Sequence, residues 1–439
     1  MAKKSPEPTS RPKERAFLIG IEIHGKQQLL SAEDSLTELA LLAKTAGLDV
    51  VGQDIQKLDR PNPNTFIGSG KVEEIQALLH ELQADVVLFD EELSPRHLRE
   101  LEEKWGYPIR VIDRTALILD IFAQHAATRE GALQVELAQY EYRLPRLTRA
   151  WTHLARQAGG GGGRSGGVGG VGLRGPGETQ LEVDRRDIRR QIAHLKAELE
   201  KVRIHRQQFR DRRKQSNLPV ISLVGYTNAG KSTLLNSLAE ADVYVADQLF
   251  ATLDPTTRRV ELPGGHMALF TDTVGFIQKL PTTLIAAFKA TLEEIAEADL
   301  LLHILDVTHV NVHAQAEAVY QTLHEINADH IPVINVLNKI DLLPDPESAK
   351  SRISAYPNAV AISALTGIGI NELLNIINKQ LFETFMPLKV NLPYQEGSLI
   401  AQFYQLGIID RVEHTRNGTI IQGTIPGRLL ASYKPFIIN

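Results

Sequence analysis

The residues best suited to chemistry form a glycine-rich loop between an apolar run at 220–224 and a helix-like segment at 233–238. The loop and the first residue of that segment are Gly225, Tyr226, Thr227, Asn228, Ala229, Gly230, Lys231, Ser232 and Thr233. Consecutive backbone N–H groups in such a turn face a phosphate, and the following helix adds the positive end of its dipole. We expect Lys231 to reach the β- and γ-phosphates and the Ser232 hydroxyl to ligate Mg²⁺. The loop therefore predicts a site for a nucleoside triphosphate.

Two later segments carry further groups for the same phosphates. The first holds Phe250, Ala251, Thr252, Leu253 and Asp254, and the second holds Asp272, Thr273, Val274 and Gly275. We expect the Asp272 carboxylate to hold Mg²⁺ through water and the Gly275 N–H to meet the γ-phosphate. Thr252 is either an ordinary loop threonine or a second Mg²⁺ ligand that lets go after hydrolysis. The candidate catalytic residues are thus Lys231, Thr252 and Gly275.

A third set of residues predicts which base is bound. It comprises Asn338, Lys339, Ile340 and Asp341, together with a later loop of Ser363, Ala364 and Leu365. An ionised Asp341 carboxylate accepts hydrogen bonds from the ring N–H and the exocyclic amino group of guanine, a donor pair that adenine lacks. We expect Asn338 to bond the other edge of the base and the Lys339 stem to cover its face. The predicted substrate is therefore GTP.

Two residues bear on the expected rate of hydrolysis. Phe276 follows Gly275, at the place where many switch GTPases carry a glutamine that orients the attacking water. Since an apolar side chain cannot polarise water, we expect hydrolysis to be slow until a partner, another residue or an ion assists. Asn228 is a candidate ligand for K⁺ near the phosphates; the alternative is that it merely stabilises the turn.

These motifs need a sheet whose strands end at the nucleotide, and the order of strand and helix signals predicts an α/β GTPase domain over 218–385. The 439 residues leave room for further domains. The chain has no cysteine, which excludes disulfides and thiolate metal sites, and no apolar run near the ~20 residues of a membrane span. Residues 1–14 predict a disordered leader without the apolar core of a signal peptide. We expect a cytoplasmic location, with transient membrane association left open.

A basic segment precedes the predicted GTPase domain. Residues 143–214 hold 18 Lys and Arg against 7 Asp and Glu, a net charge of +11, whereas the whole chain carries −5. Heptad-spaced apolar stripes at 133–154 and 181–209 flank a glycine-rich stretch at 159–177 and predict an antiparallel helical hairpin over 131–217. Pro145 is expected to kink the first helix. A basic hairpin with a glycine tip indicates an RNA partner, and a plain disordered linker is the alternative.

Smaller α/β domains are predicted over 15–130 and 386–439. In the first, we expect strands at 16–23, 84–89 and 109–112 and helices at 36–46 and 95–105. This alternation of strands and helices favours parallel pairing of the strands. There the glycine turn at 68–71 either binds phosphate or caps a helix. In the second, Val390 and Leu392 are expected to begin a strand, and Asn417 and Gly418 to form a hairpin turn. The fourteen histidines are scattered and predict no metal site.

On these motifs the chain resembles the HflX-type GTPases over nearly its whole length. The segments that carry the resemblance are residues 64–71, 142–147, 172–182, 225–232 and 250–255, in which Gly-Pro-Gly-Glu-Thr-Gln at 175–180 is highly specific. The resemblance implies binding to the large ribosomal subunit and its rRNA, GTP hydrolysis stimulated by that subunit, and dissociation of stalled or idle ribosomes. It also implies that the hairpin reaches toward the peptidyl transferase centre, and that the N-terminal domain is a candidate for ATP binding or RNA unwinding.

Two other functions stay open. One is a GTP-gated switch that binds protein partners through the hairpin, and the other is an ATP-dependent RNA remodeller that works through the N-terminal domain. Affinity that falls steeply with salt would favour RNA, because phosphate contacts release counterions. We expect a monomer in solution.

Overall fold

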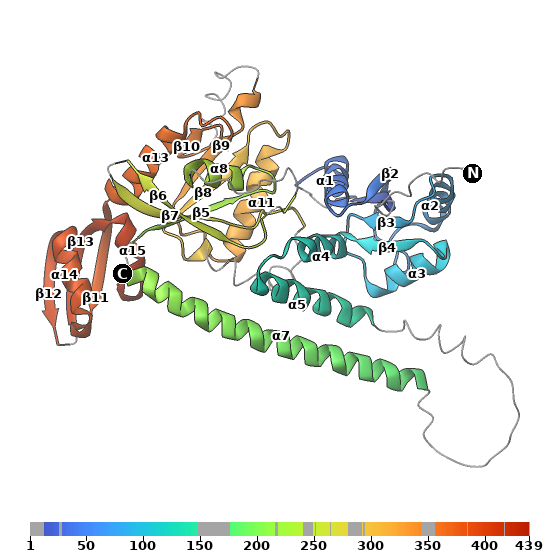
Figure 1. Cartoon of the computed structure of the whole chain (residues 1–439), viewed down its shortest axis with the longest axis horizontal. Helices are drawn as coiled ribbons and strands as arrows, with labels where there is room; N and C mark the ends of the chain where they lie inside the picture. Colours follow the sequence, from blue (N-terminus) through green and yellow to red (C-terminus); the bar gives the residue numbers. More distant parts are fainter. Residues whose placement is uncertain are drawn as a thin grey trace, which may run out of the picture. The chain divides into compact units, whose positions relative to one another are not determined.

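The described part of the computed structural model contains three β-sheets and a pair of long helices (Figure 1). The structure describes residues 13–25, 29–147, 176–215, 218–239, 249–250, 252–263, 265–279, 292, 295–343, 356–383, 385–416 and 418–438. The chain divides into two compact units, with the boundary in the second long helix between Glu200 and Lys201. In the part of the chain that is described, no helix combines the length and apolar character that crossing a membrane requires.

The N-terminal domain is a parallel sheet with helices between its strands. Its elements are β1 (Arg15–Ile23), α1 (Ala32–Thr45), β2 (Asp49–Leu58), α2 (Ser69–Glu81), β3 (Val86–Phe89), α3 (Pro95–Trp105), β4 (Arg110–Asp113) and α4 (Arg114–His125). The strand order is β2-β1-β3-β4 with every pair parallel, which confirms the predicted α/β fold. Strand β2 was not predicted, because it is an edge strand whose apolar residues are interrupted by Gln, Asp and Lys.

Two antiparallel helices form the hairpin: α5 (Arg129–Arg146) and α7 (Pro176–Gln215) lie side by side (Figure 1). Ion pairs join them between Arg129 and Glu198 at 3.2 Å and between Lys196 and Glu141 at 2.8 Å. Leu195, a member of the predicted apolar stripe, is buried at 3% exposure. The predicted helical hairpin is therefore confirmed. The predicted tip at 159–177 lies outside the described residues, apart from 176–177 at the start of α7.

The hairpin is fastened to the N-terminal sheet by the segment at 142–147. The Tyr142 hydroxyl donates a hydrogen bond to Asp113 at 2.8 Å, and Arg146 donates to the same carboxylate at 3.2 Å. The Arg146 guanidinium also lies 3.4 Å from the centre of the Tyr142 ring, a cation–π contact. Pro145 falls in the last turn of α5. This segment, distinctive in the sequence, thus joins the hairpin to the carboxyl end of β4.

The central domain has a six-stranded sheet. Its elements are β5 (Val220–Gly225), α8 (Lys231–Ala239), β6 (Thr256–Leu262), β7 (His266–Asp272), β8 (Leu300–Asp306), α11 (Val312–Glu325), β9 (Val333–Asn338), η1 (Ile340–Leu342), β10 (Ala359–Ala361), α13 (Ile370–Asn378) and η2 (Lys379–Glu383). The order is β10-β9-β8-β5-β7-β6, and β6 alone is antiparallel to its neighbour. Since neighbouring parallel strands end at one edge, the loops after β5, β7 and β9 lie close together there.

The C-terminal domain is an antiparallel sheet of order β11-β13-β12. Its elements are β11 (Phe385–Leu392), η3 (Tyr394–Glu396), α14 (Gly397–Leu406), β12 (Ile408–Thr415), β13 (Gly418–Pro426), η4 (Gly427–Leu429), α15 (Leu430–Tyr433) and η5 (Lys434–Phe436). The expectation that Val390 and Leu392 begin a strand is wrong, because β11 starts at Phe385 and these residues lie near its end. The start of the strand was missed because Pro387 argues against a strand in the sequence. An edge strand such as β11 tolerates proline.

A polar group lies in the middle of the central sheet. His303 on β8 is fully buried, and its Nδ1 is 3.1 Å from Asn335 Oδ1, which also accepts from the Tyr320 hydroxyl at 2.9 Å. The Asn335 amide donates to Pro357 O at 2.9 Å. Burial lowers the pKa of His303 to about 4, and the charge of Lys231 acts in the same direction. His303 is therefore neutral in the folded protein near pH 7.

This burial predicts a specific sensitivity to acid. The pKa of His303 is lower in the folded than in the unfolded chain, so its contribution to stability is complete above pH 6.5 and is lost as the pH falls toward 4. The loss amounts to ~3 kcal/mol of the free energy of unfolding. Urea unfolding of the central domain at pH 7 and pH 5 should show a smaller pH effect in His303→Asn than in the unsubstituted protein. An equal pH effect in both would contradict this assignment.

Candidate functional site

The loop at 225–232, here called the phosphate loop, folds as a tight turn between β5 and α8. Asn228 and Gly230 adopt left-handed conformations with φ of 60° and 97°. Lys231 is 7% exposed and its ammonium donates to the carbonyl oxygens of Gly225 at 3.1 Å and Tyr226 at 2.8 Å. The lysine thus folds back over the loop, where a phosphate that enters the turn meets both its charge and the backbone N–H groups.

Asn338, at the end of β9, connects this loop to the loop at 363–365. Its Nδ2 donates to Ala229 O at 2.9 Å, and its Oδ1 accepts from the Ala364 N–H at 2.9 Å. A Cβ on Gly230 would lie 2.3 Å from Asn338 Nδ2, so no side chain fits at Gly230. Asn338 is 2% exposed. The structure therefore gives Asn338 a role in joining the two loops, and its contact with a base stays a prediction.

Three side chains from distant segments converge beside Lys231, and we call them the Asp272 cluster. Asp272 Oδ2 accepts from the Ser232 hydroxyl at 2.6 Å and from the Thr252 hydroxyl at 2.9 Å. The Ser232 and Thr252 hydroxyl oxygens are themselves 2.8 Å apart. Among the described residues, Asp272 Oδ1 is buried and has no partner. The three residues predicted to hold a metal thus lie together at one point.

The Asp272 cluster fits a magnesium ion. Mg²⁺ prefers a few oxygen ligands from hydroxyls and carboxylates and fills its other positions with water and substrate phosphates. Ser232 and Thr252 would supply such hydroxyls, and the Asp272 Oδ1, which has no hydrogen-bond partner among the described residues, would hold a water bound to the ion. Burial lowers the pKa of Lys231 to about 8, while the Asp272 charge opposes this; burial raises the pKa of Asp272, while Lys231 opposes that. Each group therefore stabilises the charged form of the other.

The residues expected to select the base lie at the end of β9 and in η1. Lys339 has a left-handed backbone, with φ of 68°, and its ammonium pairs with Asp306 at 2.7 Å. Burial would raise the pKa of Asp306, but hydrogen bonds from Lys339 and Thr308 hold it below its ordinary range. Asp341 is exposed, as a carboxylate that reads a base requires. Asp306 was not predicted, because only the strand order brings it next to Lys339.

Other predicted residues anchor the site with side chains that point inward. Phe250 and Leu253, on either side of Thr252, are each 2% exposed and hold that segment against the core. The Thr273 hydroxyl donates to Leu223 O at 2.6 Å and so faces the sheet. Phe276 is 2% exposed, so its ring packs in the core. Ala251 lies outside the described residues.

The glycine turn at 68–71 in the N-terminal domain does not present a free lysine. Lys71 pairs with Asp54 at 2.5 Å and with Glu74 at 3.1 Å. The Gly68 N–H, at the start of α2, donates to the Gln56 side chain at 3.0 Å. These contacts favour the interpretation of this segment as a turn and helix cap over a phosphate site.

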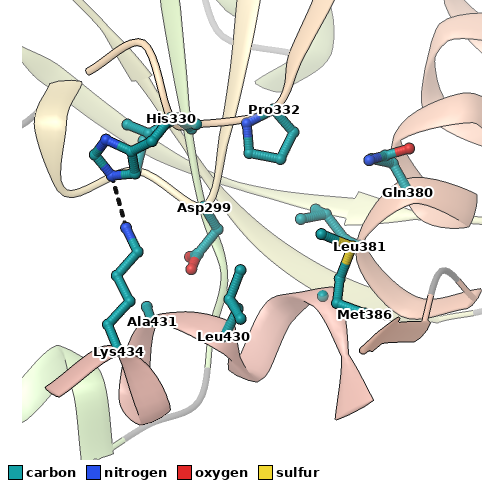
Figure 2. A pocket seen from close by; sticks show the side chains of 12 residues that line it. Asp299, His330, Pro332, Gln380, Leu381, Met386, Leu430, Ala431 and Lys434 are labelled. Carbon is teal, nitrogen blue, oxygen red and sulfur yellow. Dashed lines mark hydrogen bonds between the residues drawn. The ribbon is translucent and has the colours of Figure 1, made fainter. Parts of the chain in front are cut away.

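A separate hollow lies at the opposite edge of the central sheet, where the C-terminal domain meets it (Figure 2). Lys434 Nζ is 2.7 Å from His330 Nε2, and the Asp299 side chain lies nearby. Burial lowers the pKa of Lys434, and Asp299 opposes that shift. Within the described part of the chain, no three His, Asp or Glu side chains could hold a metal ion. The residues that line the hollow precede β8 and β9 or belong to the C-terminal end of the chain, and none of them is a predicted nucleotide-site residue.

Comparison with known proteins decides the family. Four family models match in chain order: "GTP-binding GTPase N-terminal" over 33–123, "GTP-binding GTPase Middle Region" over 125–213, "50S ribosome-binding GTPase" over 220–339 and "HflX C-terminal domain" over 348–424. GTPase HflX of Caldanaerobacter subterraneus is 43% identical, covering 99% of this chain and 96% of its own. The chain belongs to the HflX family of GTPases. The predicted resemblance is thereby confirmed.

A second relative agrees with that assignment. GTPase HflX of Escherichia coli K12 is 46% identical, covering 92% of this chain and 94% of its own length. The solved structure of SsGBP in complex with GDP is 25% identical and covers 83% of this chain and 98% of its own, with a TM-score of 0.45. The central domain is therefore a P-loop GTPase domain of an HflX protein, and its ligand is a guanine nucleotide.

Base selection by Asp341 can be tested by exchanging its carboxylate. Asp341→Asn removes an acceptor of two charge-assisted hydrogen bonds, so GDP affinity should fall by about a hundredfold. The amide can instead donate to the second carbonyl of xanthine, so xanthosine diphosphate should bind the variant better than the unsubstituted protein. Calorimetric titration with both nucleotides measures this. Unchanged GDP affinity would show that Asp341 does not read the base.

Proposed function

We propose that this HflX protein binds Mg²⁺–GTP in the central domain, hydrolyses it slowly alone, and uses the GTP-bound form to dissociate large ribosomal subunits from stalled or idle ribosomes. The convergence of Ser232, Thr252 and Asp272 beside Lys231 carries the nucleotide part of the proposal. The family description "50S ribosome-binding GTPase" supports the ribosomal part.

GTP hydrolysis requires little covalent chemistry from the protein. Phosphoryl transfer depends on positioning and on charge compensation, to which a bound Mg²⁺ contributes by neutralising phosphate charge. Lys231 lies over the phosphate loop and provides a positive charge for the β- and γ-phosphates. The Gly275 N–H would donate a hydrogen bond to a γ-phosphate oxygen. Since the Phe276 ring is buried, it orients no water, and we therefore expect a slow reaction in the absence of a partner.

We propose that the nucleotide state is read by the two loops that hold Thr252 and Gly275. Both loops gain contacts from GTP that GDP does not give, so hydrolysis relaxes them. The exposed arginines of α7, among them Arg186 and Arg189, suit the phosphates of rRNA. We propose that the protein is a cytoplasmic monomer, and that its hairpin contacts the large subunit in the GTP state.

The alternatives are less well supported. An ATP-dependent RNA remodeller would need a phosphate site in the N-terminal domain, yet Lys71 is occupied by Asp54 and Glu74. A switch for protein partners alone would not need the basic charge of the hairpin. ATPase activity that survives Asp341→Asn would favour the first alternative, and binding insensitive to salt would favour the second.

Subunit-stimulated turnover tests the proposed function. Isolated large subunits should raise the rate of GTP hydrolysis at least about tenfold, because a partner supplies groups that the free protein lacks. Arg186→Glu with Arg189→Glu should keep the intrinsic rate and lose most of the stimulation, since the introduced carboxylates would repel the phosphates of the rRNA. Phosphate release with and without subunits measures both. Equal rates in the presence and absence of subunits would refute the coupling.

Potassium is proposed as a second cation through Asn228. Turnover should be several times faster in KCl than in NaCl at equal ionic strength, because the ion would add positive charge beside the phosphates. Asn228→Ala should remove the difference. Identical rates in both salts would leave Asn228 with its conformational role, since asparagine tolerates the left-handed backbone that the turn requires.

A further inference from the structure

Tyr226, the second residue of the phosphate loop, has a side chain that phosphate binding does not explain. The loop binds phosphate through backbone N–H groups, which nearly any residue supplies. The Tyr226 side chain, however, is buried, with 5% of the residue exposed. Its hydroxyl accepts a hydrogen bond from the Gln278 backbone N–H at 2.8 Å, across 52 residues of sequence. The phenol therefore reaches the segment at 272–279, here called the switch segment.

Two main-chain hydrogen bonds accompany this contact. The Phe276 N–H donates to Gly225 O at 3.1 Å, and the Thr227 N–H donates to Phe276 O at 2.8 Å. Tyr226 and Phe276 thereby form a parallel β-bridge. Neither main-chain bond requires a particular side chain, whereas the bond to Gln278 requires a hydroxyl at the end of a ring. Of these three bonds, that one depends on the residue type.

Gly275 lies in the same segment and close to the phosphate loop. A Cβ on Gly275 would be 2.9 Å from Thr227 Cα and 3.1 Å from Lys231 Nζ, so the Gly275 backbone is pressed against the phosphate loop and its lysine. Phe276 and Ile277, which follow, are 2% and 3% exposed. Hydrogen bonds on one side and apolar burial on the other thus set the position of the Gly275 N–H.

We propose that Tyr226 is a positioning residue that ties the switch segment to the phosphate loop and so favours GTP over GDP. The inference rests on the proposed contact between the Gly275 N–H and the γ-phosphate. GDP lacks that phosphate and gains nothing from an ordered switch segment. Without the hydroxyl, the Gln278 N–H loses this acceptor whenever the switch segment is ordered. The loss therefore destabilises the GTP-bound state more than the GDP-bound state.

Tyr226→Phe tests the proposal, because it removes the hydroxyl and keeps the ring. Calorimetry on the full-length protein with Mg²⁺ should show a fall of about five- to tenfold in affinity for a non-hydrolysable GTP analogue. GDP affinity should change by less than about twofold. Tyr356→Phe is the matched control, since it removes a phenol of the same domain that contacts His313 at 2.9 Å. It should change neither affinity.

A second readout separates positioning from general destabilisation. Amide hydrogen exchange at 276–278 in the analogue-bound protein should be faster in Tyr226→Phe than in Tyr356→Phe. Equal losses for both nucleotides would make Tyr226 a structural residue and overturn the proposal, as would two unchanged affinities. If the unsubstituted protein fails to bind either guanine nucleotide, the proposed function fails, and the role of Tyr226 falls with it.

Discussion

The central domain depends on keeping a carboxylate and an ammonium charged inside a buried site. Burial favours the neutral form of both Asp272 and Lys231, and their mutual attraction opposes that tendency. Two hydroxyls that donate to Asp272 add to the stabilisation of its charge. Removing either charge would leave the other buried with less compensation, which costs free energy. The residues around the site must therefore stabilise both charges even when no ligand is bound.

Strand order explains how a chain with such distant motifs meets the requirement. In the order β9-β8-β5-β7, the segments that end in Asn338, Asp306, Gly225 and Asp272 become neighbours at one edge of the sheet. The buried His303 shows that burial inside the sheet also disfavours the charged form of a titratable side chain. Its ring is kept neutral by burial and is held by Asn335 on the next strand. The sheet thus accommodates a polar residue without placing a charge beneath Lys231.

Much of this architecture could be predicted, because short motifs report local backbone requirements. The phosphate loop, the hairpin and the order of the domains follow from spacing and periodicity. The pairs between Lys339 and Asp306 and between Asn338 and Ala229 could not be predicted, since they join residues 33 and 109 apart through the strand order. Edge strands were the weakest predictions. Strand β2 mixes polar with apolar residues, and β11 contains Pro387, so neither shows a clean alternation at its start.

The amide of Asn338 has a consequence for how nucleotides are told apart. It touches the backbone of the phosphate loop with one end and the loop at 363–365 with the other. A shift of either loop must break a hydrogen bond or move its counterpart. If a guanine nucleotide binds as proposed, its base and its phosphates would then be sensed jointly. A purine that fits badly would also loosen its own pyrophosphate, and discrimination would exceed what the purine contacts give separately.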